Sequence, residues 1–280
     1  MSNQNNFSIE GRIGFLGAGS IVEAMLSGIL KKELLAPEHL LISNRNNRER
    51  LQQLADAYGV QYTQDKREVV RSSDILILAI KPKDAAEALQ DLRGVVHADQ
   101  LVISVIAGVS TSLIEEWLGV NCPIIRTMPN TSSAVGLSAT GLAANQFVTE
   151  EQLRQATRLF EAIGTVYEVA EEELDIITGL SGSGPAYIYY LVEAMMAAGA
   201  TAGLDREMAR QLTLQTVIGA AHMLLDTREE PALLRQQVTS PGGTTQAGLE
   251  VLEAYQFQQG VTAAILRATE RSREMGAQYR

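Results

Sequence analysis

The stretch IGFLGAGSIVEAM at residues 13–25 decides the fold. An apolar run typical of a β-strand leads directly into a glycine-rich turn, and a helix-like segment follows over residues 21–35. Further apolar runs alternate with helical stretches up to about residue 169, and strands are predicted over 12–16, 40–43, 75–80, 101–105 and 124–127. The run at 75–80 is apolar throughout, as expected of a strand covered by helices on both faces. This alternation predicts an α/β fold with a doubly wound parallel sheet.

The last part of the chain has long helix-like segments and no β-branched runs. Asp205 occupies an N-cap position, and Pro185 and Pro231 suit first helical turns. We therefore expect the doubly wound domain over residues 1–169 and an all-helical domain over 170–280. Helices are predicted over 171–180, 185–202, 205–226, 231–237, 244–254 and 258–276.

Residues 179–204 contain a single charged side chain, Glu193. A helix with one face in water carries more charge than this. The segment is either the central helix of its own domain or a helix buried against a second subunit. A helical domain of this size encloses few fully buried helices, so we favour the second interpretation and predict a homo-oligomer.

Composition excludes several classes of function. The 280 residues are 46% hydrophobic and 20% charged, with 23 basic and 33 acidic side chains and a formal net charge of −10. Such a chain repels phosphate backbones and anionic membranes, so we expect neither nucleic acid nor membrane as a partner. Cys122 is the only cysteine, and His39, His97 and His222 lack metal-ligand spacing, so we expect no metal. With no secretory signal and no membrane-spanning stretch, a cytoplasmic protein is expected.

The glycine-rich turn has the spacing of a dinucleotide-binding motif. Residues 17–22, GAGSIV, match GxGxxG with Val22 in the third position. Gly17 permits a tight turn, and Gly19 lets a pyrophosphate approach the backbone, where the helix N-terminus attracts the anion. The motif alone also occurs by chance. Its position at the first strand-to-helix turn favours a cofactor site.

The end of the second strand indicates which dinucleotide binds. NAD-binding versions place a carboxylate there for the ribose 2′-hydroxyl, but residues 43–46 read Ser-Asn-Arg-Asn. Arg45 is suited to a 2′-phosphate, although a solvated loop arginine is the alternative. We therefore predict NADPH as the preferred cofactor, with NADH also accepted.

A second candidate site precedes the helix at 244–254. The sequence Ser240-Pro241-Gly242-Gly243-Thr244-Thr245 suits a nest of amides for a small carboxylate, although a plain helix cap uses the same residue types. Alcohol dehydrogenases need a positioned base, yet no lysine follows Lys83. Reduction of a C=N bond demands less of the protein, because the imine can arrive protonated. We expect the two candidate sites to face one another.

Five motifs in order resemble those of pyrroline-5-carboxylate reductases: IGFLGAGSIVEAM, LAIKPK, RTMPNTSSAVG, LSGSGPAY and VTSPGGTTQAGLEVLE. The resemblance covers about residues 13–276. It implies an N-terminal NAD(P)-binding Rossmann domain (1–169) and a C-terminal helical dimerisation and substrate-binding domain (170–280). It also implies assembly as dimers or decamers. The implied reaction is the last step of proline biosynthesis, the NAD(P)H-dependent reduction of 1-pyrroline-5-carboxylate, a small cyclic imino acid, to L-proline.

The resemblance also implies roles for single residues. In the cofactor site, the resemblance implies that the pyrophosphate is bound by Gly17, Gly19, Ser20 and Ile21, and the adenosine ribose phosphate by Ser43, Asn44 and Arg45. It places the middle of the cofactor beside Ala79, Lys81 and Pro82, and the nicotinamide beside Ala107 and Asn130. In the substrate site, the resemblance implies that Ser240, Gly243 and Thr244 bind the carboxylate. The hydroxyl of the catalytic Thr245 is expected to hydrogen-bond the ring nitrogen, and Glu171 is expected to lie near that nitrogen in the assembled dimer.

The chain departs from the family pattern at several positions, which are Val22, Lys66, Ser132, Leu137 and Ser138. These departures bear on kinetics and cofactor preference more than on the reaction. Two other functions remain open at this stage: a β-hydroxyacid dehydrogenase of similar architecture, and an NADP-binding sensor without catalysis.

Overall fold

The computed structural model describes residue 9 and residues 11–279. The chain forms two compact units. The first unit runs up to Ser183 and takes up the chain again from Arg267, and the second unit is Gly184–Leu266. These units follow from packing alone. The functional domains over 1–169 and 170–280 stay a prediction.

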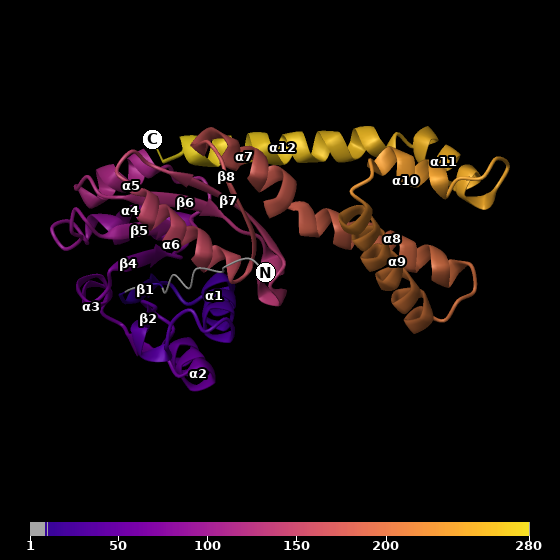
Figure 1. Ribbon diagram of the computed structural model, residues 1–280. Helices are drawn as coiled ribbons and strands as arrows, with labels where there is room; N and C mark the ends of the chain where they lie inside the picture. Colours follow the sequence, from indigo (N-terminus) through magenta and orange to yellow (C-terminus); the bar gives the residue numbers. More distant parts are fainter. Residues whose placement is uncertain (1–8, 10, 280) are drawn as a thin grey trace, which may run out of the picture. The chain divides into compact units, whose positions relative to one another are not determined.

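The first unit is built on an eight-stranded sheet with the order β3-β2-β1-β4-β5-β6-β7-β8 (Figure 1). All neighbours are parallel except β6 and β7. The first six strands have the order of a dinucleotide-binding doubly wound sheet, which confirms the predicted fold class. The strands are β1 (Ile13–Leu16), β2 (Leu40–Ser43), β3 (Gln61–Thr63), β4 (Ile75–Leu78), β5 (Leu101–Ser104), β6 (Ile124–Met128), β7 (Ser138–Ala144) and β8 (Gly164–Glu168).

Two hydrophobic cores lie on opposite faces of this sheet. Phe15 and Ile77 pack with α1, α2 and α6 on one face, and Leu76 and Leu78 pack with α3, α4 and α5 on the other (Figure 1). Successive strand residues alternate between the cores, which is why the strands are apolar throughout. The helices are α1 (Ser20–Lys31), α2 (Arg48–Tyr58), α3 (Lys66–Arg71), α4 (Pro82–Gln90), α5 (Thr111–Leu118) and α6 (Glu150–Glu161).

The predicted helix over 171–180 is a series of short turns. A 3₁₀ turn, η3 (Glu171–Glu173), leads into α7 (Leu174–Ile177) and then into a π-helical turn, η4 (Thr178–Gly182). Another 3₁₀ turn, η2 (Thr131–Val135), links β6 to β7. Among the described residues, no helix is long and apolar enough to cross a membrane.

The second unit is helical, as predicted, with α8 (Gly184–Thr201), α9 (Arg206–Thr227), α10 (Pro231–Gln237) and α11 (Thr244–Ala254). Asp205 caps α9, and its carboxylate accepts hydrogen bonds from the backbone N–H groups of Glu207 and Met208. The long α12 (Phe257–Ala277) begins in the second unit and ends in the first.

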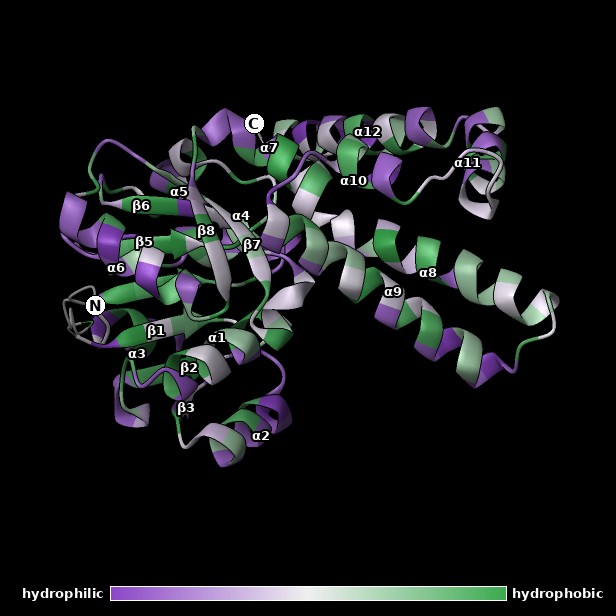
Figure 2. Cartoon of the chain, turned by 45° about the vertical axis from the view of Figure 1, so that its right-hand side comes forward, coloured by the Kyte–Doolittle hydropathy of each residue, from purple (hydrophilic) through white to green (hydrophobic). Residues whose placement is uncertain are grey.

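The second unit buries almost none of its apolar side chains. Within it only Ala209 and Thr213 are buried, and Figure 2 shows hydrophobic residues in green along α8 and α9. Tyr190 is 77% exposed, and Leu225 and Tyr255 of the same unit are 72% and 83% exposed. Burial of each such side chain is worth about 1.5–3 kcal/mol, so this surface favours a second chain as its cover.

Cys122 is buried in the second of the two cores of the first unit, the one formed with α3, α4 and α5. Burial, together with the nearby charge of Glu115, raises the pKa of this thiol to about 12. A thiol that stays protonated in an apolar core is unreactive, so Cys122 is a packing residue.

Candidate functional site

Gly17 lies where the carboxyl ends of three strands meet. Its φ is +129°, and a Cβ at this position would lie 2.2 Å from the Ala79 carbonyl oxygen, so only glycine fits. The Gly17 N–H donates to the Ser43 carbonyl at 2.9 Å, and the Ala79 N–H donates to the Leu16 carbonyl at 2.9 Å. The structure therefore brings three predicted cofactor residues, Gly17, Ser43 and Ala79, together at the carboxyl ends of β1, β2 and β4, where the strand order reverses.

The N-terminus of α1 is open. Gly19 is its N-cap residue, no side chain caps the helix, and a Cβ built on Gly19 would meet no atom of the protein within 4 Å. Ser20 and Ile21 begin the helix, and their backbone amides have no helical carbonyl to bond. Free amides beside open space fit a pyrophosphate.

Arg50 supports this turn and was not predicted. From α2 its Nε donates to the Ala18 carbonyl oxygen at 3.1 Å, and its guanidinium forms an ion pair with Glu23 in the first turn of α1. The pair neutralises a carboxylate that would otherwise repel a phosphate at the helix N-terminus. The dinucleotide motif contains no residue that would have indicated this arginine.

The loop after β2 leaves one cation exposed. The Asn44 side-chain oxygen accepts the backbone N–H groups of Asn46 and Asn47 at 3.1 and 3.0 Å and so shapes the turn. The Ser43 hydroxyl is buried and donates to the Phe15 carbonyl oxygen. The Arg45 side chain is 75% exposed, and its Nη1 lies 3.2 Å from the Glu87 carboxylate on α4.

Two of the residues predicted for the middle of the cofactor, Lys81 and Pro82, lie at the N-terminus of α4. Lys81 is the exposed N-cap residue of α4, and Pro82 is in its first turn. Lys66, a departure from the family pattern, bonds the other end of α4 through the Ala88 carbonyl oxygen at 3.2 Å and the Asp91 carboxylate at 2.8 Å. The hydrogen bond and charge of Lys66 lower the pKa of Asp91.

Asn130 links two segments of the first unit. Its side-chain oxygen accepts from the Ser132 N–H at 2.9 Å, and its side-chain nitrogen donates to the Ser181 carbonyl oxygen at 3.0 Å. Its own N–H donates to the Ser138 hydroxyl at 3.0 Å. Ser132 and Ser138, both departures from the family pattern, are therefore partners of Asn130.

The other residue predicted to border the nicotinamide lies in the loop after β5. Ala107 is half-buried, and the adjacent Gly108 packs against Gly276 near the end of α12. A Cβ at Gly276 would lie 2.9 Å from the Gly108 carbonyl oxygen. The last turns of α12 therefore pack against this loop at Gly108.

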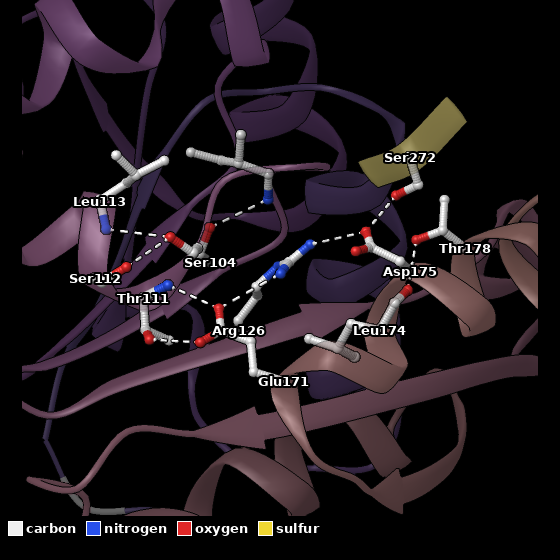
Figure 3. Close-up of polar contacts among 12 residues, drawn as sticks. Ser104, Thr111, Ser112, Leu113, Arg126, Glu171, Leu174, Asp175, Thr178 and Ser272 are labelled. Atoms are coloured by element: carbon white, nitrogen blue, oxygen red, sulfur yellow. Dashed lines mark hydrogen bonds and ion pairs between the residues drawn. The ribbon is translucent and has the colours of Figure 1, made fainter. Parts of the chain in front are cut away.

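Glu171 belongs to an ion-pair network inside the first unit. Its carboxylate accepts from the Thr111 N–H at 2.8 Å and from the Thr111 hydroxyl at 2.7 Å. Arg126 on β6, with a side chain 9% exposed, lies between Glu171 at 3.4 Å and Asp175 at 3.8 Å (Figure 3). Asp175 also accepts from the Ser272 hydroxyl of α12 at 2.6 Å. The predicted contact of Glu171 with substrate stays a prediction.

The substrate residues predicted after Val238 lie in the second unit. The Gly243 N–H donates to the Ser240 carbonyl oxygen at 3.0 Å and closes a turn, and Gly243 is the N-cap residue of α11. The helix has no side-chain cap and no acidic residue in its first turn. Its N-terminus is therefore a favourable place for an anion.

Thr244 and Thr245 are exposed in this first turn. Within the part of the chain that the structure describes, their hydroxyls have no hydrogen-bond partner. Thr216 and Thr227, by contrast, donate to the carbonyl four residues earlier in α9. The two hydroxyls of α11 thus remain available for a ligand.

Comparison with known proteins places both units in one family. A model of the pyrroline-5-carboxylate reductase dimerisation domain matches residues 171–275, and a model described as NADP oxidoreductase, coenzyme F420-dependent, matches residues 12–108. A pyrroline-5-carboxylate reductase of Bacillus subtilis (strain 168) is 45% identical over 96% of both chains, and one of Arabidopsis thaliana is 38% identical over 94% of this chain and 95% of its own.

Solved structures agree in fold. A pyrroline-5-carboxylate reductase from Coxiella burnetii has a TM-score of 0.88 at 38% identity and covers 95% of this chain and 98% of its own. A Plasmodium falciparum pyrroline carboxylate reductase with NADP bound has a TM-score of 0.88 at 30% identity, over 96% and 99% of the two chains. The chain therefore belongs to the pyrroline-5-carboxylate reductase family.

Proposed function

We propose that this protein reduces 1-pyrroline-5-carboxylate to L-proline with NADPH, the last step of proline biosynthesis, in the cytoplasm. The observation that carries the proposal is the open N-terminus of α11, where the hydroxyls of Thr244 and Thr245 and the first amides of the helix are available to an anionic, hydrogen-bonding ligand. A small ring that bears both a carboxylate and a nitrogen fits this set of donors. Membership of the family supports the same substrate.

The residues of the first unit fit a phosphorylated dinucleotide. Gly17, Gly19 and the first amides of α1 would hold the pyrophosphate, and Arg45 would hold the 2′-phosphate. Asn44 would keep the loop of Arg45 in shape, while Lys81 and Pro82 begin the helix beside the middle of the cofactor. When bound, NADPH supplies the hydride that the C=N carbon accepts.

In the second unit, α11 would bind and orient the imine. Ser240, Gly243 and Thr244 would line the site of its carboxylate, with the free N–H of Thr244 as a donor, and the Thr245 hydroxyl would hydrogen-bond the ring nitrogen. The imine binds in its protonated form. The C=N π electrons pass to nitrogen as the carbon gains hydride, so the nitrogen keeps its proton and no catalytic base is required.

The decisive experiment follows NADPH absorbance with and without the cyclic imine. Imine-dependent oxidation supports the proposal. Turnover of β-hydroxy acids instead would favour the dehydrogenase, and NADPH binding without turnover of any imine would favour the sensor.

Replacement of Arg45 by glutamate is expected to raise the KM for NADPH by about 10- to 100-fold, because a charge-assisted hydrogen bond is replaced by repulsion. The KM for NADH should change little. Steady-state kinetics with both cofactors measures the ratio. Arg48→Glu, an exposed arginine in the first turn of α2, is the matched control. An unchanged preference in the Arg45 variant would remove Arg45 from the phosphate site.

The exposed apolar surface of the second unit leads us to propose a homodimer as the basic assembly, with the decamer as the larger form that the resemblance implies. Light scattering at micromolar concentration should give a mass at least twice the 30.3 kDa of one chain. A monomeric mass would contradict this proposal. The net charge of −10 supports a protein that binds neither nucleic acid nor membrane surfaces.

A further inference from the structure

We propose that Glu87 sets the strength of the preference for NADPH, by holding Arg45 in an ion pair that the 2′-phosphate must displace. This inference rests on the proposed function, because it takes Arg45 as the residue that receives the phosphate. It adds a determinant of cofactor specificity that lies outside the dinucleotide motif, on a helix that follows a different strand.

The geometry joins two parts of the chain that are far apart in sequence. Arg45 follows β2, and Glu87 lies in the middle of α4, which follows β4. Arg45 Nη1 is 3.2 Å from Glu87 Oε1, and the two side chains are 75% and 64% exposed. The pair therefore sits in solvent at the carboxyl edge of the sheet, within reach of a ligand.

Glu87 is held in place by the helix that carries it. Ala85 and Leu89 of α4 are buried in the core, so Glu87, two residues from each, faces away from it. Lys66 fixes the following turn through the Ala88 carbonyl oxygen and Asp91. The carboxylate is thus presented to Arg45 by a well-anchored element rather than by a loose loop.

Electrostatics gives the direction of the effect. A phosphate that bonds Arg45 must compete with the carboxylate already there, and the two anions repel each other across a few ångströms. NADH lacks the 2′-phosphate and meets no such competition. An exposed ion pair contributes little to folding, so its loss should alter specificity without altering stability.

The test compares four full-length proteins: the wild type, Glu87→Gln, Arg45→Gln and the double variant. Binding of 2′,5′-ADP and of 5′-ADP is measured by calorimetry at low salt, and the Kd values of NADPH and NADH by fluorescence titration. Glu87→Gln should lower the Kd values of 2′,5′-ADP and NADPH by about three- to tenfold. The Kd values of 5′-ADP and NADH should stay within about twofold of the wild-type values. In the Arg45→Gln background the same change should have a clearly smaller effect, because the competition for Arg45 is gone and only the direct repulsion between the two anions remains.

Two controls make the result specific. Glu49→Gln removes one negative charge from an exposed position in the first turn of α2. An equal gain in that variant would assign the effect to net charge and overturn the inference. The thermal unfolding midpoint should match that of the wild type in Glu87→Gln.

Failure of the inference differs from failure of the proposed function. If Glu87→Gln binds 2′,5′-ADP as the wild type does, Glu87 has no role, whatever the enzyme reduces. If the wild type shows no imine-dependent oxidation of NADPH, the proposed reaction falls, while the binding measurements still decide the role of Glu87.

Discussion

Gly17→Ala is expected to destabilise the protein by about 3 kcal/mol or more and to abolish tight binding of NADPH. The added Cβ would lie 2.2 Å from the Ala79 carbonyl oxygen, and φ at +129° is strained for any residue with a side chain. The contact cannot be relieved locally, because Gly17 and Ala79 lie in backbone hydrogen bonds with neighbouring strands. Circular dichroism should show an unfolding midpoint lower by roughly 6–12 °C.

Gly19→Ala is the matched control. Its φ is −80°, and a Cβ there meets no protein atom within 4 Å, so the unfolding midpoint should stay at the wild-type value. The methyl group would occupy the space through which a pyrophosphate reaches the amides of α1. We therefore expect a Kd for NADPH about tenfold weaker or more. Wild-type stability in Gly17→Ala would contradict the packing of this turn, and wild-type NADPH affinity in Gly19→Ala would contradict the pyrophosphate site.

Thr245→Ala should lower kcat by about tenfold or more while the protein stays folded. The hydroxyl is exposed and makes no hydrogen bond within the described residues, so its removal costs the fold little. If it bonds the ring nitrogen as that nitrogen changes from imine to amine, the loss appears in kcat. Steady-state kinetics with saturating NADPH measures the effect.

Two further variants separate the hydroxyl from its position. Thr245→Ser keeps the hydroxyl and should retain most of the activity. Thr244→Ala removes the neighbouring hydroxyl in the same turn and should act mainly on the KM for the imine, because Thr244 is assigned to the carboxylate. A wild-type kcat in Thr245→Ala would discard its catalytic role.

The central strands could be predicted because their side chains identify them. Ile75–Leu78 is buried on both faces, and a strand of that kind has an unbroken apolar sequence. β7 was missed because Ser138–Ala144 consists mostly of small residues, and β8 because much of Gly164–Glu168 is exposed. Their strand character comes from pairing with β6 and with each other, which no local pattern reveals.

The candidate site divides in the same way. The turn at Gly17 and the nest before Thr244 are local in sequence, so their spacing predicted them. Arg50 and Glu87 act through contacts with residues 27 to 42 positions away. Which arginine meets which carboxylate depends on how strands and helices are stacked, and single-sequence patterns do not carry that information.

The exposed apolar side chains of α8 and α9 affect how the stability of the protein depends on its concentration. If these side chains are buried against an identical chain, folding is coupled to association. The unfolding midpoint then rises with the protein concentration. In a two-fold arrangement every altered residue also occurs twice, once from each copy. A destabilising substitution in the interface on α8 or α9 would therefore lower the free energy of unfolding of the dimer by about twice as much as the same change would in a monomer.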